Sequence, residues 1–322
     1  YEPIQPIHYS HKIHSGQNGI DCKYCHSSAR VSKHSGIPSL NVCMNCHKSI
    51  YEVAESGIVR VVLNRAGARN AQDTRMLYEL NDALDLAAQD DEVKVIVIAA
   101  NGPHFSAGHD LREKDPVTTQ QSFKTVTTWG GFERDGAEGQ FAREQEIYLG
   151  FCERWRNIPK PTMVEVQGKV IAGGVMLVWP FDIVVASEDA TFQDNTVAMG
   201  ICGAEFFNHP YELGVRKAKE MLFTSDEVTA QDAYRLGAVN HVVPREQLSE
   251  FTMGLARKIS QKNLFSLKLT KMAVNAAEDN AGRTSTNQTA FALHHLLHTH
   301  FKLTSGIGVD PEFMRNFDKK TT

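Results

Sequence analysis

HFSAGHDL (His104–Leu111) and VIAGGVML (Val170–Leu177) are the two stretches of this sequence on which the fold depends. Each contains glycine and follows a run rich in β-branched residues, so each is expected to be a turn at the end of a strand. Backbone N–H groups in such turns can point at an anion, and two that meet at one oxygen form an oxyanion hole. Either turn alone is weak evidence, because glycine-rich turns after strands are common and often only structural.

The segments around these turns alternate between strand and helix patterns. Residues 51–65 (YEVAESGIVRVVLNR) predict a hairpin with its turn at Ser56-Gly57, and residues 73–90 predict a helix with one apolar face. Three further segments predict strands: VKVIVIAA (93–100), TMVEVQGKVIAGG (162–174) and DIVVASEDATFQ (182–193). The second turn is expected to open a helix. Strands that alternate with helices indicate an α/β fold.

The composition is that of a soluble globular protein with room for one large domain or two. The chain has 322 residues, of which 42% are hydrophobic and 22% charged, and its net charge is −4. Nothing in this balance points to nucleic acid or an anionic membrane as a partner. The longest apolar runs are too short to span a bilayer, so no membrane span is predicted.

The order and spacing of five segments between residues 51 and 322 resemble the crotonase (enoyl-CoA hydratase/isomerase) superfamily. These are NRAGARNA, FSAGHDL, VQGKVIAGG, DIVVASEDATF and AKEMLFTSDEVTAQDAYRLGAVNHVVP. The resemblance implies a spiral of ββα units with a helical C-terminal part that trimerises, giving a homotrimer or hexamer. It also implies a cytoplasmic lyase or isomerase whose substrate is an acyl-coenzyme A thioester.

The resemblance also assigns roles to residues in the two turns. It implies that the thioester oxygen is held by the backbone N–H groups of His109 and Gly173. At His109 the family role needs only the backbone, and the imidazole side chain is extra. The turn Asn64–Ala71, which includes Arg69, and Ala107 fall where the family contacts the nucleotide part of coenzyme A.

Two positions depart from the pattern of the hydratases. Those enzymes carry a glutamate three residues after the second oxyanion-hole glycine and another some twenty residues further on, where this chain has Met176 and Thr196. Hydration needs a general base for water and an acid for the α-carbon. Methionine and threonine can supply neither, so the usual acid/base pair is absent while the oxyanion hole is expected to be intact.

Glu205, in GICGAEFFNHP, is the first candidate for the missing proton-transfer group. Family members with other chemistry place an acidic residue close to this position, and a salt-bridged loop residue is the alternative. Asp110, Asp194 and His209 are weaker candidates, and Asp110 is expected to cap a turn. The histidines of LHHLLHTHF (293–301) fall on several faces of a helix, so a solvated or interface helix is expected there rather than a metal site.

The first fifty residues have a different composition, which places a domain boundary near residue 50. They contain four of the six cysteines and six of the fourteen histidines, with five basic residues against two acidic ones. Cys22-Lys-Tyr-Cys25-His26 and Cys43-Met-Asn-Cys46-His47 both have the C-x-x-C-H spacing of c-type haem attachment. A four-cysteine zinc site and a pair of disulfides are the alternatives, but neither explains the histidine after each pair.

Each haem iron would take the histidine of its own motif, His26 or His47, as the proximal ligand. His11 is the first candidate for a sixth ligand, followed by His14 and His34, whereas His8 fits a solvated surface residue equally well. Residues 1–50 resemble the small multihaem cytochromes c, most closely the pentahaem subunit of alternative complex III. The resemblance implies two covalent haem c groups, electron transfer and a redox partner.

The two parts predict different compartments. Covalent haem attachment belongs to a periplasmic or other extracytoplasmic space, whereas coenzyme A chemistry belongs to the cytoplasm. No Gly-, Ser- or Pro-rich linker joins them at Ile50-Tyr51. Two interpretations stay open, a natural fusion and a composite chain. Two functions follow, an acyl-CoA enzyme of about 270 residues and an electron-transfer haem module of fifty.

The first testable prediction concerns haem loading. Chain produced in a host that attaches haem c should carry two haems and no free thiol among Cys22, Cys25, Cys43 and Cys46, because each motif consumes both of its cysteines. A pyridine haemochrome assay and a thiol titration measure both quantities. A haem count near zero, with zinc bound in its place, would overturn this interpretation.

Overall fold

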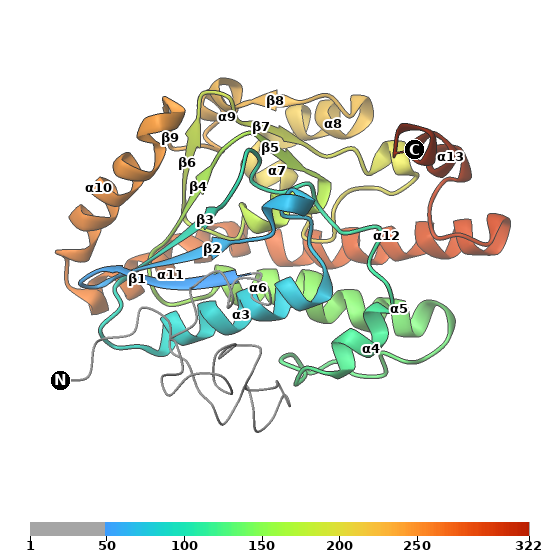
Figure 1. Cartoon of the computed structure of the whole chain (residues 1–322), viewed down its shortest axis with the longest axis horizontal. Coiled ribbons are helices and arrows are strands. Elements are labelled where there is room, and N and C mark those ends of the chain that lie inside the picture. The colour runs from blue at the N-terminus through green and yellow to red at the C-terminus, as the bar shows by residue number, and fades with distance from the viewer. Residues whose placement is uncertain (1–48, 322) are drawn as a thin grey trace, which may run out of the picture.

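The computed structural model describes residues 49–321, which form two sheets surrounded by helices (Figure 1). The main sheet has the order β1-β2-β3-β4-β6-β9, in which β1 and β2 are antiparallel and the other neighbours are parallel. Its strands are β1 (Ser49–Glu55), β2 (Ile58–Leu63), β3 (Val95–Ala100), β4 (Thr162–Val166), β6 (Ile183–Ser187) and β9 (His241–Val243). The smaller sheet contains β5 (Lys169–Ile171), β7 (Thr191–Gln193) and β8 (Val228–Thr229), in that order.

Helices connect the strands and form the C-terminal part of the chain. The α-helices are α3 (Thr74–Gln89), α4 (Pro116–Gln121), α5 (Gly136–Glu144), α6 (Phe151–Arg156), α7 (His209–Glu212), α8 (Gly214–Thr224), α9 (Ala230–Leu236), α10 (Leu248–Ser260), α11 (Leu264–Asn280), α12 (Arg283–Ser305) and α13 (Pro311–Thr321). The remaining helices are not α-helical: η2 (Ala66–Ala68), η4 (Ala172–Leu177), η5 (Val197–Met199) and η6 (Arg245–Gln247) are 3₁₀ helices, and η3 (Gln145–Gly150) is a π-helix.

The main sheet is buried on both faces, as expected for parallel strands. In β3, Ile96 and Ile98 belong to the apolar core that includes α3, whereas Val95 and Val97 belong to a second core that includes Met253 of α10. This alternation follows from the two-residue period of a strand. Helices α3 and α10 therefore cover opposite faces of the sheet, as Figure 1 shows.

Most of the predicted elements are present. The hairpin turns at Ser56-Gly57 between β1 and β2, and α3 follows Asp73, whose carboxylate accepts a hydrogen bond from the Met76 N–H at 2.9 Å. The segments 162–174 and 182–193, however, are each two strands in different sheets rather than one.

Gly168 explains why the first of these predictions was wrong. It takes a φ of 59°, and a Cβ there would lie 2.2 Å from the Pro103 carbonyl oxygen, so the chain turns sharply at a point that only glycine fits. The helix expected after the second turn is a 3₁₀ helix, η4.

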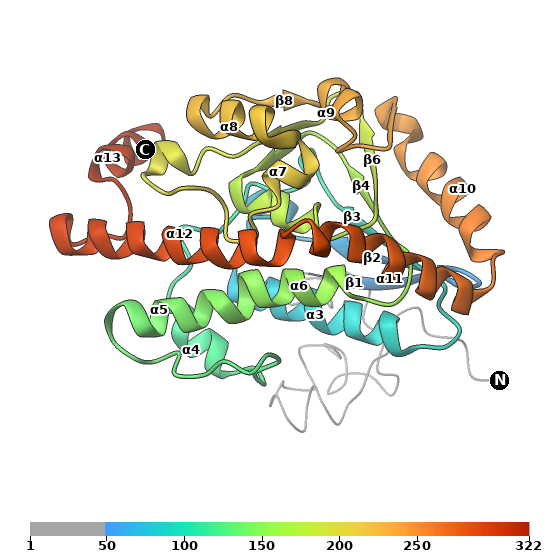
Figure 2. The ribbon, with the colours of Figure 1, turned by 180° about the vertical axis from the view of Figure 1, so that it is seen from behind.

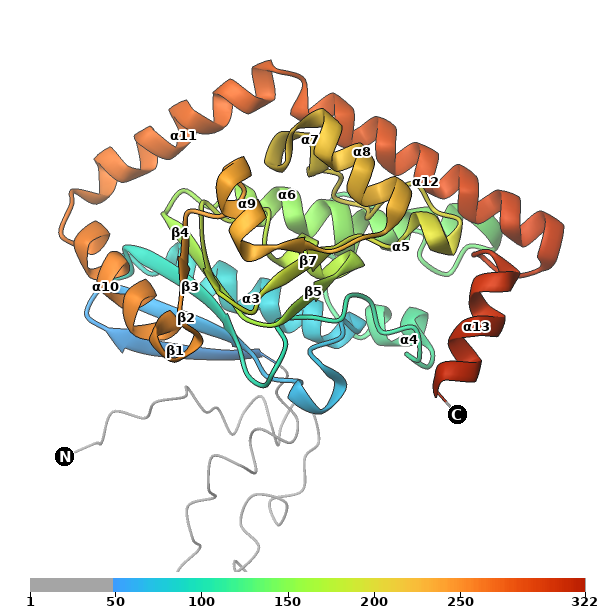
Figure 3. The same ribbon diagram turned by 90° about the horizontal axis from the view of Figure 1, so that it is seen from above.

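Helices α11 and α12 form one long edge of the molecule, with α10 and α13 near its opposite ends (Figure 3). Seen from behind, α12 runs alongside α5 (Figure 2). Large apolar side chains are exposed on α11 and α12: Phe265, Leu269, Met272, Val274, Leu293, Leu296 and Leu303. Exposed apolar groups of this kind are typical of interfaces, and the oligomeric state stays a prediction. Over residues 49–321 no helix has the length and apolar character that crossing a membrane requires.

The haem prediction falls outside the described residues. It involves Cys22, Cys25, Cys43, Cys46 and the histidines at positions 8, 11, 14, 26, 34 and 47. Haem attachment and electron transfer therefore stay predictions. The boundary at Ile50-Tyr51 is also untested, and strand β1 begins at Ser49.

Candidate active site

The first turn is held between strand β5 and Gln72. On one side Ile171 donates its backbone N–H to the Ser106 carbonyl at 3.1 Å. On the other, the Gln72 N–H donates to the Gly108 carbonyl at 2.7 Å, and the Asp110 N–H donates to the Gln72 carbonyl at 2.8 Å. Because the residues before and after His109 make this parallel bridge, the N–H of His109 itself faces away from Gln72.

The second turn is tied to the first through the same glutamine. The Gln72 side-chain amide donates to the Gly173 carbonyl at 2.7 Å. Gly108 has a φ of +84°, and a Cβ there would lie 2.6 Å from the Ile171 carbonyl oxygen, so glycine is required for the contact. Gly173 lies in the first turn of η4, where N–H groups have no partner inside the helix. Within residues 49–321, neither His109 nor Gly173 donates its backbone N–H to a protein acceptor.

The two turns lie at the wall of a cavity of about 930 Å³. Its lining includes the five residues predicted for the acyl-CoA site, which are Arg69, Ala107, His109, Gly173 and Glu205, and also Thr196. Met176 is absent from this lining; its side chain is 1% exposed and packs in the apolar core. The Thr196 hydroxyl donates to Asp194 Oδ1 at 2.6 Å. Neither position therefore presents an acid or base to the cavity.

Glu205 is a buried carboxyl group at the cavity wall. Its Oε2 lies 3.6 Å from His109 Nε2, and its Oε1 lies 3.4 Å from His294 Nε2. Burial, reinforced by the charge of Glu144, raises the pKa of Glu205 well above its usual value. Among the described residues its ion-pair partners are imidazoles rather than Lys or Arg, which disfavours the alternative of an ordinary salt-bridged loop residue.

The His109 imidazole is a further group in this wall. Its ring stacks on Tyr148, with centroids 4.0 Å apart and planes 8° from parallel. It also covers Gly173, where an added Cβ would lie 2.4 Å from His109 Nε2. Burial lowers the pKa of His109 to about 4, so the ring is neutral at neutral pH. Tyr148 was not identified from the sequence; it lies in the π-helical η3, a distortion frequent at functional sites.

The weaker candidates hold the structure around the site. Asp194 and His209 are both fully buried and pair at 2.7 Å, while Asp194 Oδ2 also accepts the Ala204 N–H at 2.9 Å. Burial would raise the pKa of Asp194, but its hydrogen bonds to His209 and Thr196 lower it to about 2. This pair fixes the loop that carries Glu205. Asp110 pairs with Arg65 at 2.6 Å and accepts the Arg112 N–H at 3.0 Å, as expected for a turn cap.

The histidines of α12 differ from expectation. His294 and His295 are 3% and 6% exposed, so this face of the helix is neither solvated nor a free interface. It packs on α5, and His295 Nε2 lies 3.3 Å from Glu144 Oε2. The spacing of His294 and His298 could have indicated a shared face, but nothing in the sequence around Glu144 indicates that it joins them.

Comparison with known proteins identifies one family to which the chain is similar. Residues 53–309 match the family described as Enoyl-CoA hydratase/isomerase. EchA13 of Mycobacterium tuberculosis, described as an enoyl-CoA hydratase, is 39% identical to this chain over 266 residues. The match covers 80% of this chain and 82% of that protein. The mouse mitochondrial enoyl-CoA hydratase domain-containing protein 3 is 35% identical over 64% of this chain and 63% of its own.

Solved structures give the same result. A probable enoyl-CoA hydratase from Mycobacterium smegmatis superposes with a TM-score of 0.73 at 42% identity, covering 81% of this chain and 98% of that one. The fold and the paired turns thus define a crotonase-like protein. The chain belongs to the enoyl-CoA hydratase/isomerase family.

The contact between the His109 ring and Gly173 generates a prediction for stability. Gly173→Ala should lower the free energy of unfolding by about 1–3 kcal/mol, because the new methyl group overlaps the imidazole. In a His109→Ala background the overlap is gone, so the same substitution should cost less. Denaturant unfolding of the four proteins measures the difference. Gly67→Ala is the control, since no atom lies within 4 Å of a Cβ there. An equal cost of Gly173→Ala in both backgrounds would contradict the assigned contact.

Proposed function

We propose that this chain processes acyl-coenzyme A thioesters and stabilises the thioester enolate between the backbone N–H groups of His109 and Gly173. The observation that supports this most strongly is the pair of unpartnered N–H groups on turns that Gln72 holds together at the cavity wall. Such preorganised donors stabilise the charge that develops on the oxygen. An enolate is the intermediate that isomerisation, hydration and C–C cleavage share in this family.

The nucleotide part of coenzyme A is assigned to the side of the cavity formed by Arg69 and Ala107. The Arg69 carbonyl accepts the Ala107 N–H at 2.9 Å, so the two residues lie side by side. Arg69 is exposed, and its backbone is in the left-handed region with a φ of 54°, so the chain turns sharply at this residue. An exposed guanidinium at the edge of a cavity suits a phosphate group.

Glu205 is proposed as the proton-transfer group. It is a buried carboxyl of the cavity wall, and it adjoins the imidazole of the residue whose N–H would bind the thioester oxygen. Met176 and Thr196 offer no carboxylate, so a two-glutamate hydration is disfavoured. A single carboxyl group suits an isomerase or a lyase that moves one proton at the α-carbon.

Ligand binding tests the proposed substrate class. The full chain should bind acetyl-CoA and crotonyl-CoA in calorimetric titrations, and it should hydrate crotonyl-CoA only slowly because the acid/base pair is absent. Arg69→Ala should weaken binding about two- to fivefold, the loss expected for one exposed ionic contact. Arg112→Ala removes a neighbouring exposed guanidinium outside the cavity and serves as the control. No binding at millimolar ligand would refute the proposal, and hydration at ordinary hydratase rates would refute the account of the missing pair.

Proton exchange tests Glu205 without knowledge of the natural substrate. In D₂O the protein should exchange the α-protons of butyryl-CoA, which mass spectrometry of the recovered thioester measures. Glu205→Gln keeps the shape and removes the base, so exchange should slow by about 10²–10⁴-fold. Glu312→Gln makes the same change at an exposed position of the cavity lining and should leave the rate unchanged. A Glu205→Gln protein that exchanges at the parent rate would exclude this role.

A further inference from the structure

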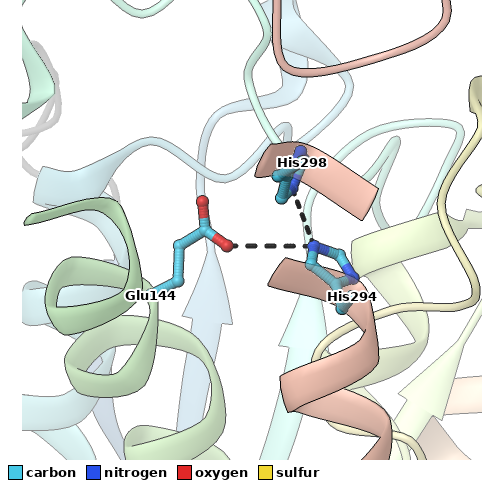
Figure 4. A group of neighbouring side chains, drawn as sticks. All are labelled: Glu144, His294 and His298. Atoms are coloured by element: carbon cyan, nitrogen blue, oxygen red, sulfur yellow. Dashed lines mark hydrogen bonds and ion pairs between the residues drawn. The ribbon is translucent and has the colours of Figure 1, made fainter. Parts of the chain in front are cut away.

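Three side chains that the proposed reaction does not use converge at the cavity wall. Glu144 ends α5, and His294 and His298 lie one turn apart on the facing side of α12, as Figure 4 shows. All three line the cavity, and their nearest nitrogen and oxygen atoms lie within 4.8 Å of one another. Two histidines at i and i+4 on one helix face are a spacing that binds zinc in other proteins.

Backbone carbonyls determine which ring nitrogen of each histidine carries the proton. His294 Nδ1 lies 2.8 Å from the Gly203 carbonyl oxygen, and His298 Nδ1 bonds to the Gly308 carbonyl oxygen. A carbonyl oxygen can only accept, so both Nδ1 atoms must donate. In a neutral imidazole the other nitrogen then has no proton. Both Nε2 atoms therefore present a lone pair.

These two lone pairs face each other. His294 Nε2 and His298 Nε2 are 2.9 Å apart, a separation at which two acceptors repel unless a positive charge lies between or beside them. The Glu144 carboxylate adds a third acceptor, because its Oε2 lies 3.8 Å from His294 Nε2. That oxygen is buried and has no hydrogen-bond donor among the described residues. Three electron-pair donors thus converge on one point. The nearest groups that could donate a hydrogen to them are His295, whose Nε2 lies 3.3 Å from Glu144 Oε2, and the Glu205 carboxyl group, whose Oε1 lies 3.4 Å from His294 Nε2.

We propose that Glu144, His294 and His298 bind a divalent transition-metal ion, with Zn²⁺ as the ion of reference. Two nitrogens about 2.0–2.1 Å from a tetrahedral zinc ion lie about 3.3 Å from each other. The two Nε2 atoms are 2.9 Å apart here, so they need to separate by only about 0.4 Å to hold the ion. Two histidines and one glutamate form a known ligand set for zinc and for other divalent transition metals.

The surroundings support the three side chains as ligands. Metal-bound histidines usually donate their second nitrogen to a carbonyl or carboxylate, and both histidines here do so. The other oxygen of Glu144 accepts a hydrogen bond from Gln140 Nε2 at 2.8 Å, and Lys302 Nζ donates to the Gln140 oxygen at 2.5 Å. The carboxylate is thereby oriented by the protein.

Three protein ligands leave coordination positions open. Because all three residues line the cavity, these positions face the same space as the His109 and Gly173 N–H groups. Ion binding does not depend on the proposed acyl-CoA chemistry, and each can fail without the other. The alternative to an ion is a single proton shared by the two imidazoles, which predicts no bound metal.

Metal stoichiometry tests the site in the full chain. Because the four cysteines before residue 50 can bind zinc themselves, the parent protein for this test carries Cys22→Ser, Cys25→Ser, Cys43→Ser and Cys46→Ser. After loading with ZnCl₂ and removal of loosely held metal, elemental analysis should find one zinc per chain. Glu144→Gln and His298→Gln should each lose it. His300→Gln, an exposed histidine on the same helix, should retain it.

Cobalt provides a measurement that does not depend on the variants folding. Co²⁺ bound by nitrogen and oxygen ligands should give visible d–d absorption in the four-serine parent, without the near-ultraviolet band of a thiolate ligand. Circular dichroism of the metal-free proteins shows whether each variant is folded. No retained zinc and no cobalt spectrum in the parent would overturn the proposal, as would folded Glu144→Gln and His298→Gln proteins that keep their zinc.

Discussion

The hydrogen bonds of Gln72 are the constraint on which the rest of the site depends. This one residue bonds through its backbone to Gly108 and Asp110 and through its buried side chain to Gly173, which are distant in sequence. The two glycine-rich turns follow different strands and also bond to each other directly, because the Ile171 N–H donates to the Ser106 carbonyl at 3.1 Å. The N–H groups of His109 and Gly173 lie on turns that line the cavity and have no acceptor among the described residues. In the proposed function, Gln72 would thus position both donors of the oxyanion hole although it does not itself line the cavity.

Around these turns the cavity wall carries an unusual density of buried ionisable groups. The pKa values of Glu205 and Glu144 shift in opposite directions, although both side chains are largely shielded from solvent. Burial raises the pKa of Glu205, with Glu144 adding to the effect. At Glu144 the positive charge that His298, His295 and His294 carry when they are protonated outweighs burial and lowers the pKa. Carboxyl groups that share a low-dielectric space cannot both ionise at low cost. The two shifts therefore favour a proton on Glu205 over a proton on Glu144, and such divergence is characteristic of functional sites.

The sequence predicted the fold more completely than the site. Local patterns sufficed for the hairpin, for α3 and for β3, because the periodicity of apolar residues and the turn glycines act over a few positions. The same logic misread 162–174 as one strand, since only the contact of Gly168 with Pro103 reveals that the chain changes sheets there. Glu144 and His298 are far apart in sequence, and no local pattern reports that α5 packs against α12. The paired turns were found because a family resemblance supplies long-range information that periodicity does not.

Met176 occupies the position at which the hydratases are expected to carry their first glutamate. Its side chain packs among apolar residues such as Val175 and Leu177 and is 1% exposed. A carboxylate there would lose its hydration without gaining a partner, which costs several kcal/mol. The segment from Val175 to Leu177 is thus part of the core, whereas Gly173, at the start of the same helix, lines the cavity. In the proposed function the proton-transfer group comes instead from the loop that Asp194 and His209 hold in place, which brings Glu205 to the cavity wall. Backbone donors and side-chain chemistry are supplied by separate parts of the fold, so the second can change while the first is kept.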